Sequence, residues 1–233
     1  MTSPALGAPG TPILPDYAPV PQASLGPAVN DQGYYVGRVE RNLYWVTDGD
    51  YHAAFLIGGE RIQLAWHRAN HSPDNIYIHF PDHDTLMLVD IALPGWVPFY
   101  GINLSEDVPG YMQAPAIALN YPWSHFICGH LGRLATREDV AVHQQYIADI
   151  EASAREALAM VNPVPYYMHY GENFWAGVKA HLDTVTERAA APIIAKYTGV
   201  LAAADIEVFT RTTTFAIMQS LRLDSGPSGP VHP

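Results

Sequence analysis

The chain has 233 residues, of which 48% are hydrophobic and 15% charged, and its formal net charge is −11. This composition is typical of a folded globular protein rather than a disordered chain. The acidic balance disfavours nucleic acid and anionic membranes as partners, and no apolar run is long enough to cross a bilayer. We expect a cytoplasmic protein, because one cysteine excludes an intrachain disulfide and no secretory signal precedes Arg38, the first basic residue.

The N-terminal half predicts strands after a leading arm. Residues 1–32 are rich in Pro, Gly and Ala without periodicity, which favours an extended or disordered arm. β-branched and aromatic residues separated by turn signals then predict six strands, over 33–39, 42–47, 52–57, 61–66, 75–80 and 85–90. The P-D-H-D segment at 81–84 joins the last two as a tight hairpin, so we expect an antiparallel meander.

The pattern changes after residue 90. Residues 93–111 predict a Pro- and Gly-rich loop whose aromatic side chains could cover a cleft. A short helix is expected over 114–120 with Pro115 in its first turn, followed by a buried strand over 125–128. Thr136 and the acids after it predict a helix N-terminus, and apolar residues at three- and four-residue steps extend that helix to about Val161.

The C-terminal part predicts mainly helix from 172 to 223, with breaks near Pro192, Gly199 and Asp205. We therefore divide the chain into an arm (1–32), a domain with the strands (33–165), a helical region (166–224) and a flexible tail (225–233). The helical region could cover the domain or mediate dimerisation, and the sequence leaves both open.

Three residues of metal-binding type stand where predicted strands end: His71, Asp90 and His130. Strand ends present side chains to shared clefts. Two imidazoles and one carboxylate suit a borderline divalent ion such as zinc, or iron. The sequence therefore predicts a metal site formed by these three residues.

Four segments resemble, in this order, the second half of metallo-β-lactamase-fold hydrolases: G-G-E-R-I-Q-L-A-W-H-x3-H-S-P-D-N-I-Y-I-H-F-P, T-L-M-L-V-D, W-V-P-F and C-G-H-L-G. Residues 33–57 are similar to the opening strands of that family, and the resemblance extends over roughly 33–148. It implies an αββα sandwich in which His71 binds a first zinc, Asp90 bridges two metals and His130 binds the second.

The chain departs from this family in one respect. It contains no H-x-H-x-D-H signature, because A-A-F-L-I runs directly into G-G-E-R-I. The expected fold is thus α+β, a metallo-β-lactamase-like sandwich without the N-terminal strand–helix units that carry this motif, plus C-terminal helices. We expect one zinc ion rather than two. A replacement catalytic base is also needed, for which His67, Asp74 and His79 are the nearby candidates.

Two functions remain open. The first is a zinc-dependent hydrolase that opens an amide, ester, thioester or lactam of a small-molecule substrate, impaired by the missing segment. The second is a non-catalytic remnant that acts as a binding or oligomerisation module, since the missing block leaves strand edges unpaired. The other side chains that could bind metal are expected to be structural or surface groups, with Cys128 buried and inert and His79 and His83 solvated; the remaining structural histidines are His125, His143, His169 and His181.

Overall fold

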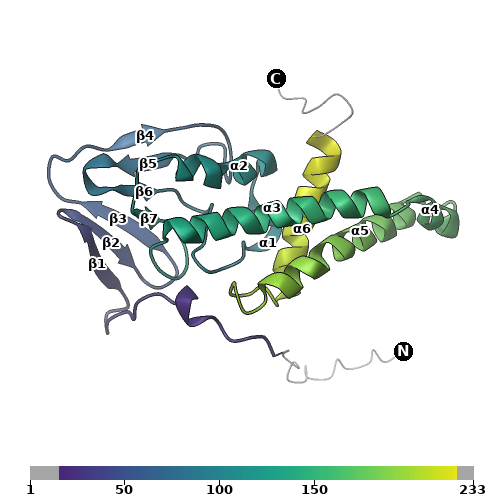
Figure 1. The fold of residues 1–233 in the computed structure, drawn as a ribbon, viewed down its shortest axis with the longest axis horizontal. Helices are drawn as coiled ribbons and strands as arrows, with labels where there is room; N and C mark the ends of the chain where they lie inside the picture. Colours follow the sequence, from purple (N-terminus) through teal and green to yellow (C-terminus); the bar gives the residue numbers. More distant parts are fainter. Residues whose placement is uncertain (1–15, 225–233) are drawn as a thin grey trace, which may run out of the picture.

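The strands of the computed structural model form two small sheets, which makes the chain a mixed α+β protein (Figure 1). The structure describes residues 16–224, so the predicted tail and the first 15 residues lie outside the described part. The first sheet is antiparallel, in the order β1 (Tyr35–Glu40), β2 (Leu43–Thr47), β3 (His52–Leu56). The second has the order β4 (Gln63–Ala65), β5 (Tyr77–Phe80), β6 (Thr85–Met87), β7 (His125–Ile127).

The predicted strands are present, although β4 and β6 are shorter than expected. Strand β2 shows the two-residue period of a sheet with one buried face, because Leu43, Trp45 and Thr47 are buried and the residues between them are half-buried. Four strand pairs join neighbours in the sequence, β1–β2, β2–β3, β4–β5 and β5–β6, and all four are antiparallel, as the meander prediction requires. Strand β7, in contrast, pairs parallel to β6. That parallel pair needs the long connection supplied by the loop and helices between the two strands.

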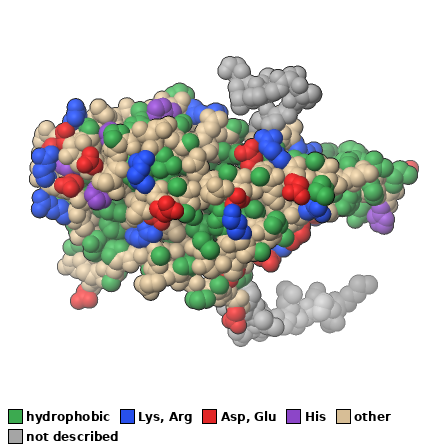
Figure 2. Space-filling view, in the orientation of Figure 1, with side chains coloured by type: hydrophobic (Ala, Val, Ile, Leu, Met, Phe, Trp, Pro, Cys, Tyr) green, Lys and Arg blue, Asp and Glu red, His purple; other side chains and the backbone are tan. Residues whose placement is uncertain are grey.

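The described part of the chain has helices before, between and after the strands. They are η1 (Gln22–Ser24), η2 (Pro81–His83), α1 (Tyr100–Leu104), α2 (Val108–Leu119), α3 (Arg137–Met160), α4 (Val164–Tyr170), α5 (Phe174–Tyr197) and α6 (Glu207–Asp224). Figure 1 shows α3 and α5 side by side, leading away from the sheets to α4 at the far end. Hydrophobic side chains gather at that end of the molecular surface in Figure 2. We call α3, α4 and α5 the helical arm.

Helix α3 begins where the sequence predicts. The Thr136 hydroxyl accepts a hydrogen bond from the Asp139 amide at 3.2 Å, and the Asp139 carboxylate accepts one from the Thr136 amide at 2.7 Å. This capping box satisfies two amides that the first helical turn leaves free. Burial alone would raise the pKa of Asp139, but hydrogen bonds from Arg133 and Thr136 outweigh it and hold that pKa below its usual value.

One hydrophobic core joins the second sheet to the helices. It contains residues from the sheet, from α2 and α3, and from the C-terminal helices, among them Leu86, Phe126, Tyr111, Ile150 and Ile217. The C-terminal helices therefore contribute to the same core as the strands. No helix in the described part of the chain is long and apolar enough to span a membrane.

Several local expectations were wrong. Helix α2 begins at Val108, not near residue 114, because the Asp107 side chain caps it by accepting from the Gly110 amide at 2.7 Å, and Pro115 lies inside the helix. Pro192 does not break α5, since Ala190 and Ile193 on one face of the helix are buried against the core, although Pro192 itself is exposed. The N-terminal segment is described from residue 16, and a hydrogen bond from the Ser24 hydroxyl to the Gly95 carbonyl holds it against the loop after β6.

Two histidines expected to be solvated are buried instead: His79 is 4% exposed and His83 is 1% exposed. His79 sits between β4 and the start of β7, where its ring nitrogens lie 3.1 Å from the Gln63 side-chain oxygen and 3.3 Å from the Pro122 carbonyl. The hairpin packs against neighbouring segments on the side of these two histidines, whereas Asp82 and Asp84 in its turn are exposed.

Candidate metal centre

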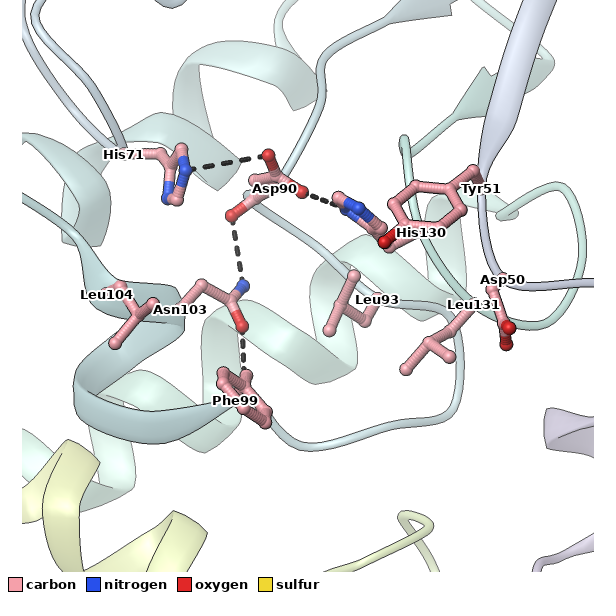
Figure 3. Close-up of a pocket in the computed structure, with 10 residues that line it drawn as sticks. All are labelled: Asp50, Tyr51, His71, Asp90, Leu93, Phe99, Asn103, Leu104, His130 and Leu131. Atoms are coloured by element: carbon pink, nitrogen blue, oxygen red, sulfur yellow. Dashed lines mark hydrogen bonds and ion pairs between the residues drawn. The ribbon is translucent and has the colours of Figure 1, made fainter.

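A pocket of about 440 Å³ opens beside the end of β6 (Figure 3). The three residues expected to bind a metal all face it. Its walls combine these polar groups with apolar and aromatic side chains, and the lining residues are Asp50, Tyr51, His71, Asp90, Leu93, Phe99, Asn103, Leu104, His130 and Leu131. The fold therefore brings together the three site residues that are far apart in the sequence.

Asp90 lies between the two histidines, as Figure 3 shows. One carboxylate oxygen is hydrogen-bonded to Nδ1 of His130, and the other lies 3.5 Å from Nε2 of His71. The side chains of His71, Asp90 and His130 are 25%, 20% and 39% exposed. They form the floor of the pocket and still reach solvent, which a site for an exchangeable ligand requires.

The backbone at the site is held in unusual conformations. Asp90 has a positive φ of 62°, and its amide donates to the Cys128 carbonyl at 3.1 Å. Gly129, just before His130, has a φ of 90°, and a Cβ atom there would stand 2.8 Å from the Val89 side chain. Only glycine fits this approach without strain, so the Gly-His pair brings His130 against the end of β6.

Two asparagines fix the turn that carries His71. The Asn70 side-chain oxygen accepts from the His71 amide at 2.7 Å and from the Asn75 side-chain amide at 2.9 Å. The Asn75 amide group also donates to the Val89 carbonyl at 2.9 Å. These bonds tie the His71 turn directly to the residue preceding Asp90.

A buried polar network supports the segment on the other side of Asp90. The Asn103 amide group donates to the Asp90 carbonyl at 3.0 Å and to the Tyr111 hydroxyl at 2.9 Å. That hydroxyl donates to the Ile91 carbonyl and lies 3.3 Å from Nε2 of His143 in α3. Hydrogen bonds in a dry interior fix geometry, so this network holds the loop after Asp90.

The protonation of His143 predicts a pH effect. Burial lowers the pKa of His143 to about 4, below the usual 6.5. The unfolded chain therefore binds a proton that the folded chain resists, and stability falls as the pH drops through 6.5 towards 4. Between about pH 7.5 and pH 5, wild type should lose about 2 kcal/mol more unfolding free energy than the variant His143→Gln. Urea unfolding at both pH values checks this, and equal losses in the two proteins would contradict it.

The two proposed catalytic residues lie outside the lining of this pocket. Nε2 of His67 is 2.7 Å from the Tyr121 hydroxyl, and its ring packs edge-on against Tyr77. Asp74 accepts a hydrogen bond from the Ser72 hydroxyl at 2.8 Å and lines a second, shallower hollow. Their assignment as acid–base groups stays a prediction, and neither is placed by the fold beside Asp90.

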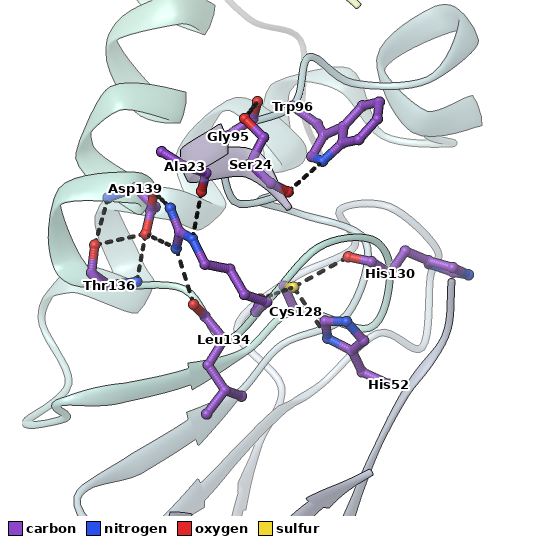
Figure 4. A network of polar contacts seen from close by, with 11 residues as sticks. Ala23, Ser24, His52, Gly95, Trp96, Cys128, His130, Leu134, Thr136 and Asp139 are labelled. Atoms are coloured by element: carbon purple, nitrogen blue, oxygen red, sulfur yellow. Dashed lines mark hydrogen bonds and ion pairs between the residues drawn. The ribbon is translucent and has the colours of Figure 1, made fainter. Parts of the chain in front are cut away.

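The structure also adds residues that the sequence analysis did not select. The Tyr51 ring packs edge-on against the His130 ring, with centroids 4.9 Å apart, and Asp50 lines the same pocket. Below them, Nδ1 of the buried His52 lies 3.5 Å from Sγ of Cys128 (Figure 4). Burial raises the pKa of Cys128 to about 12, which fits an inert thiol. The D-G-D-Y-H segment that leads into β3 could have indicated these residues, since it clusters polar residues at a strand end.

The donor set can be tested against a metal ion. Two ligands of a tetrahedral zinc ion stand about 3.3 Å apart, close to the 3.5 Å between His71 Nε2 and Asp90 Oδ2. His130 contacts Asp90 directly, so an ion would need that pair to separate slightly. Within residues 16–224, no group of three or more His, Cys, Asp or Glu side chains already has the spacing to hold an ion. The residue types of the three donors suit zinc, whereas their spacing as it stands does not hold an ion.

Comparison with known proteins does not assign this chain to a family. No known family's sequence model matches it, and no curated protein does either.

Proposed function

We propose that the chain is a metal-dependent hydrolase of the metallo-β-lactamase superfamily, with one zinc ion held by His71, Asp90 and His130. The observation that carries the proposal is the convergence of these three side chains on one pocket. Their order and motifs resemble those of the family's second half, and the α+β architecture with two small sheets is compatible with a reduced form of its sandwich. When bound, zinc supplies a water of lowered pKa as the nucleophile.

The chain's own residues would bind and orient the substrate. Leu93, Phe99 and Leu104 give the pocket apolar walls, which favour an apolar part of an amide, ester, thioester or lactam. Apart from Asp90, the carboxylate that lines the pocket is Asp50. It joins His67 and Asp74 as a candidate group for proton transfer. The absence of the H-x-H-x-D-H segment removes ligands that family members possess, so we propose reduced activity relative to a complete enzyme.

Metal analysis of the protein tests this function. Protein incubated with zinc and then desalted should retain about one ion per chain, and His71→Ala and His130→Ala should each lose it. His67→Ala is the matched control, because that histidine lies outside the pocket and should leave the zinc content unchanged. Wild type without zinc affinity would overturn the proposal.

A second function is favoured by one observation. Strands β3 and β4 and their flanks expose Phe55, Ile57, Leu64 and Trp66 by 59–66%. Such apolar side chains on sheet edges are typical of surfaces that pair with another chain. A non-catalytic module that self-associates through these strands would be rejected by a monomer that hydrolyses esters in a zinc-dependent way.

A further inference from the structure

The far end of the helical arm carries a large exposed apolar surface, which we call the tip patch. Trp175 is 78% exposed and Met168 is 77% exposed, values that apolar side chains rarely reach on a monomer. The patch comprises Met160, Val164, Met168, Tyr170, Phe174 and Trp175, each at least 40% exposed. Figure 2 shows hydrophobic side chains covering this end of the molecule.

Local packing holds the patch in a fixed shape. A Cβ atom on Gly177 of α5 would stand 2.9 Å from the Tyr167 ring, so α4 lies directly against α5 there. Tyr167 also stacks on Phe174 with ring centroids 5.3 Å apart, and Phe174 contacts Trp175. Tyr166 and Tyr167 are half-buried against α5, while α4 presents Val164 and Met168, one helical turn apart, to solvent.

The area of the patch matches a protein–protein interface. Full-size side chains of these types cover about 150–250 Å² each, so the exposed parts of the six total roughly 700 Å². A stable interface buries about 800 Å² on each partner, whereas an isolated monomer exposes patches of about 300–600 Å² at most. The exposed area of the tip patch is therefore close to the area that one partner buries in a stable interface.

The charges around the patch favour a second copy over a lipid surface. Lys179 pairs with Asp183 at 2.5 Å, and Arg155 pairs with Glu151 at 2.6 Å, so these cations of the arm are neutralised within their own helices. An anionic lipid surface would gain little from these paired cations. The rim also carries Arg188, whose guanidinium contacts the Met160 sulfur at 3.3 Å, and a contact between two copies is driven by the apolar area rather than by these charges.

We propose that the tip patch is the interface through which two copies of this chain associate about a two-fold axis. This inference is independent of the proposed hydrolase function, because the patch lies on the arm and shares no residue with the metal pocket.

Sedimentation of the full chain over a concentration series tests the proposal. Wild type should sediment as a dimer, at twice the 25.6 kDa mass of one chain, with a dissociation constant of about 10 µM or tighter. Trp175→Glu and Met168→Glu should each weaken association by at least about 30-fold, since they place a charge in the centre of the contact. Both side chains are exposed, so the Tm and the zinc content of each variant should match wild type.

The matched control is Phe55→Glu, which places the same charge on a side chain of β3 that is 60% exposed. It should leave the dimer intact. A wild type that stays monomeric would overturn the proposal. A dimer that dissociates in Phe55→Glu but not in Trp175→Glu would also overturn it, because the contact would then lie on the sheet. Monomeric wild type that binds phosphatidylcholine vesicles through Trp175 would also overturn it, in favour of a lipid surface.

Discussion

Asp90→Asn is expected to lower the zinc affinity of the chain by more than about 100-fold, because even residues that only support metal ligands contribute 10–100-fold. Asp90 is the carboxylate between the two histidines, in contact with His130 and 3.5 Å from His71. The substitution keeps the shape of the side chain and removes the negative charge that an ion would share. Competition of zinc against a chromophoric chelator measures the change directly.

Asp74→Asn is the control for this experiment. It makes the same chemical change on a carboxylate close in sequence to His71, which lines a different hollow. Zinc affinity in this variant should stay within about twofold of wild type, as expected for a group without contact to the ion. Equal affinities for wild type and Asp90→Asn would show that the three residues are not a metal site.

The features set by local sequence could be predicted. Helix α3 begins at Arg137 because Thr136 and Asp139 form a capping box, and both are adjacent enough in sequence to be recognised. Asp90 and His130 each follow a strand by three residues, as that pattern predicts, whereas His71 lies midway along the loop between β4 and β5 rather than at a strand end. Their convergence was an expectation from order and resemblance, and the fold brings them to one pocket.

The features set by tertiary packing could not be predicted. Pro192 lies within α5 because Ala190 and Ile193 on either side of it are buried against the core, a tertiary contact that residue propensity does not register. His79 is buried because β4 and the segment before β7 close over it from both sides. Asn103 reaches Asp90 only through a left-handed turn at residues 101–104, a backbone conformation that the non-glycine residues there do not signal.

A single methyl group at Gly110 should destabilise both the fold and the metal site. Alanine normally stabilises a helix relative to glycine by about 0.5–1 kcal/mol, so the expected sign without tertiary contacts is a gain. Here a Cβ atom would stand 1.9 Å from the Ala69 carbonyl oxygen, a contact with backbone that cannot simply rotate away. Gly110→Ala must therefore push α2 away from the segment that leads to His71.

The bonds lost in that movement hold the His71 turn. The Glu106 amide donates to the His71 carbonyl at 3.0 Å, and the Asp107 amide donates to the Asn70 carbonyl at 3.1 Å. We expect Gly110→Ala to lose about 3 kcal/mol of unfolding free energy in urea and to bind zinc more weakly than wild type. Gly59→Ala is the control, since a Cβ atom there meets nothing within 4 Å and the change should stay within about 0.5 kcal/mol. An unfolding midpoint for Gly110→Ala equal to that of Gly59→Ala would mean that α2 does not press on the turn of His71.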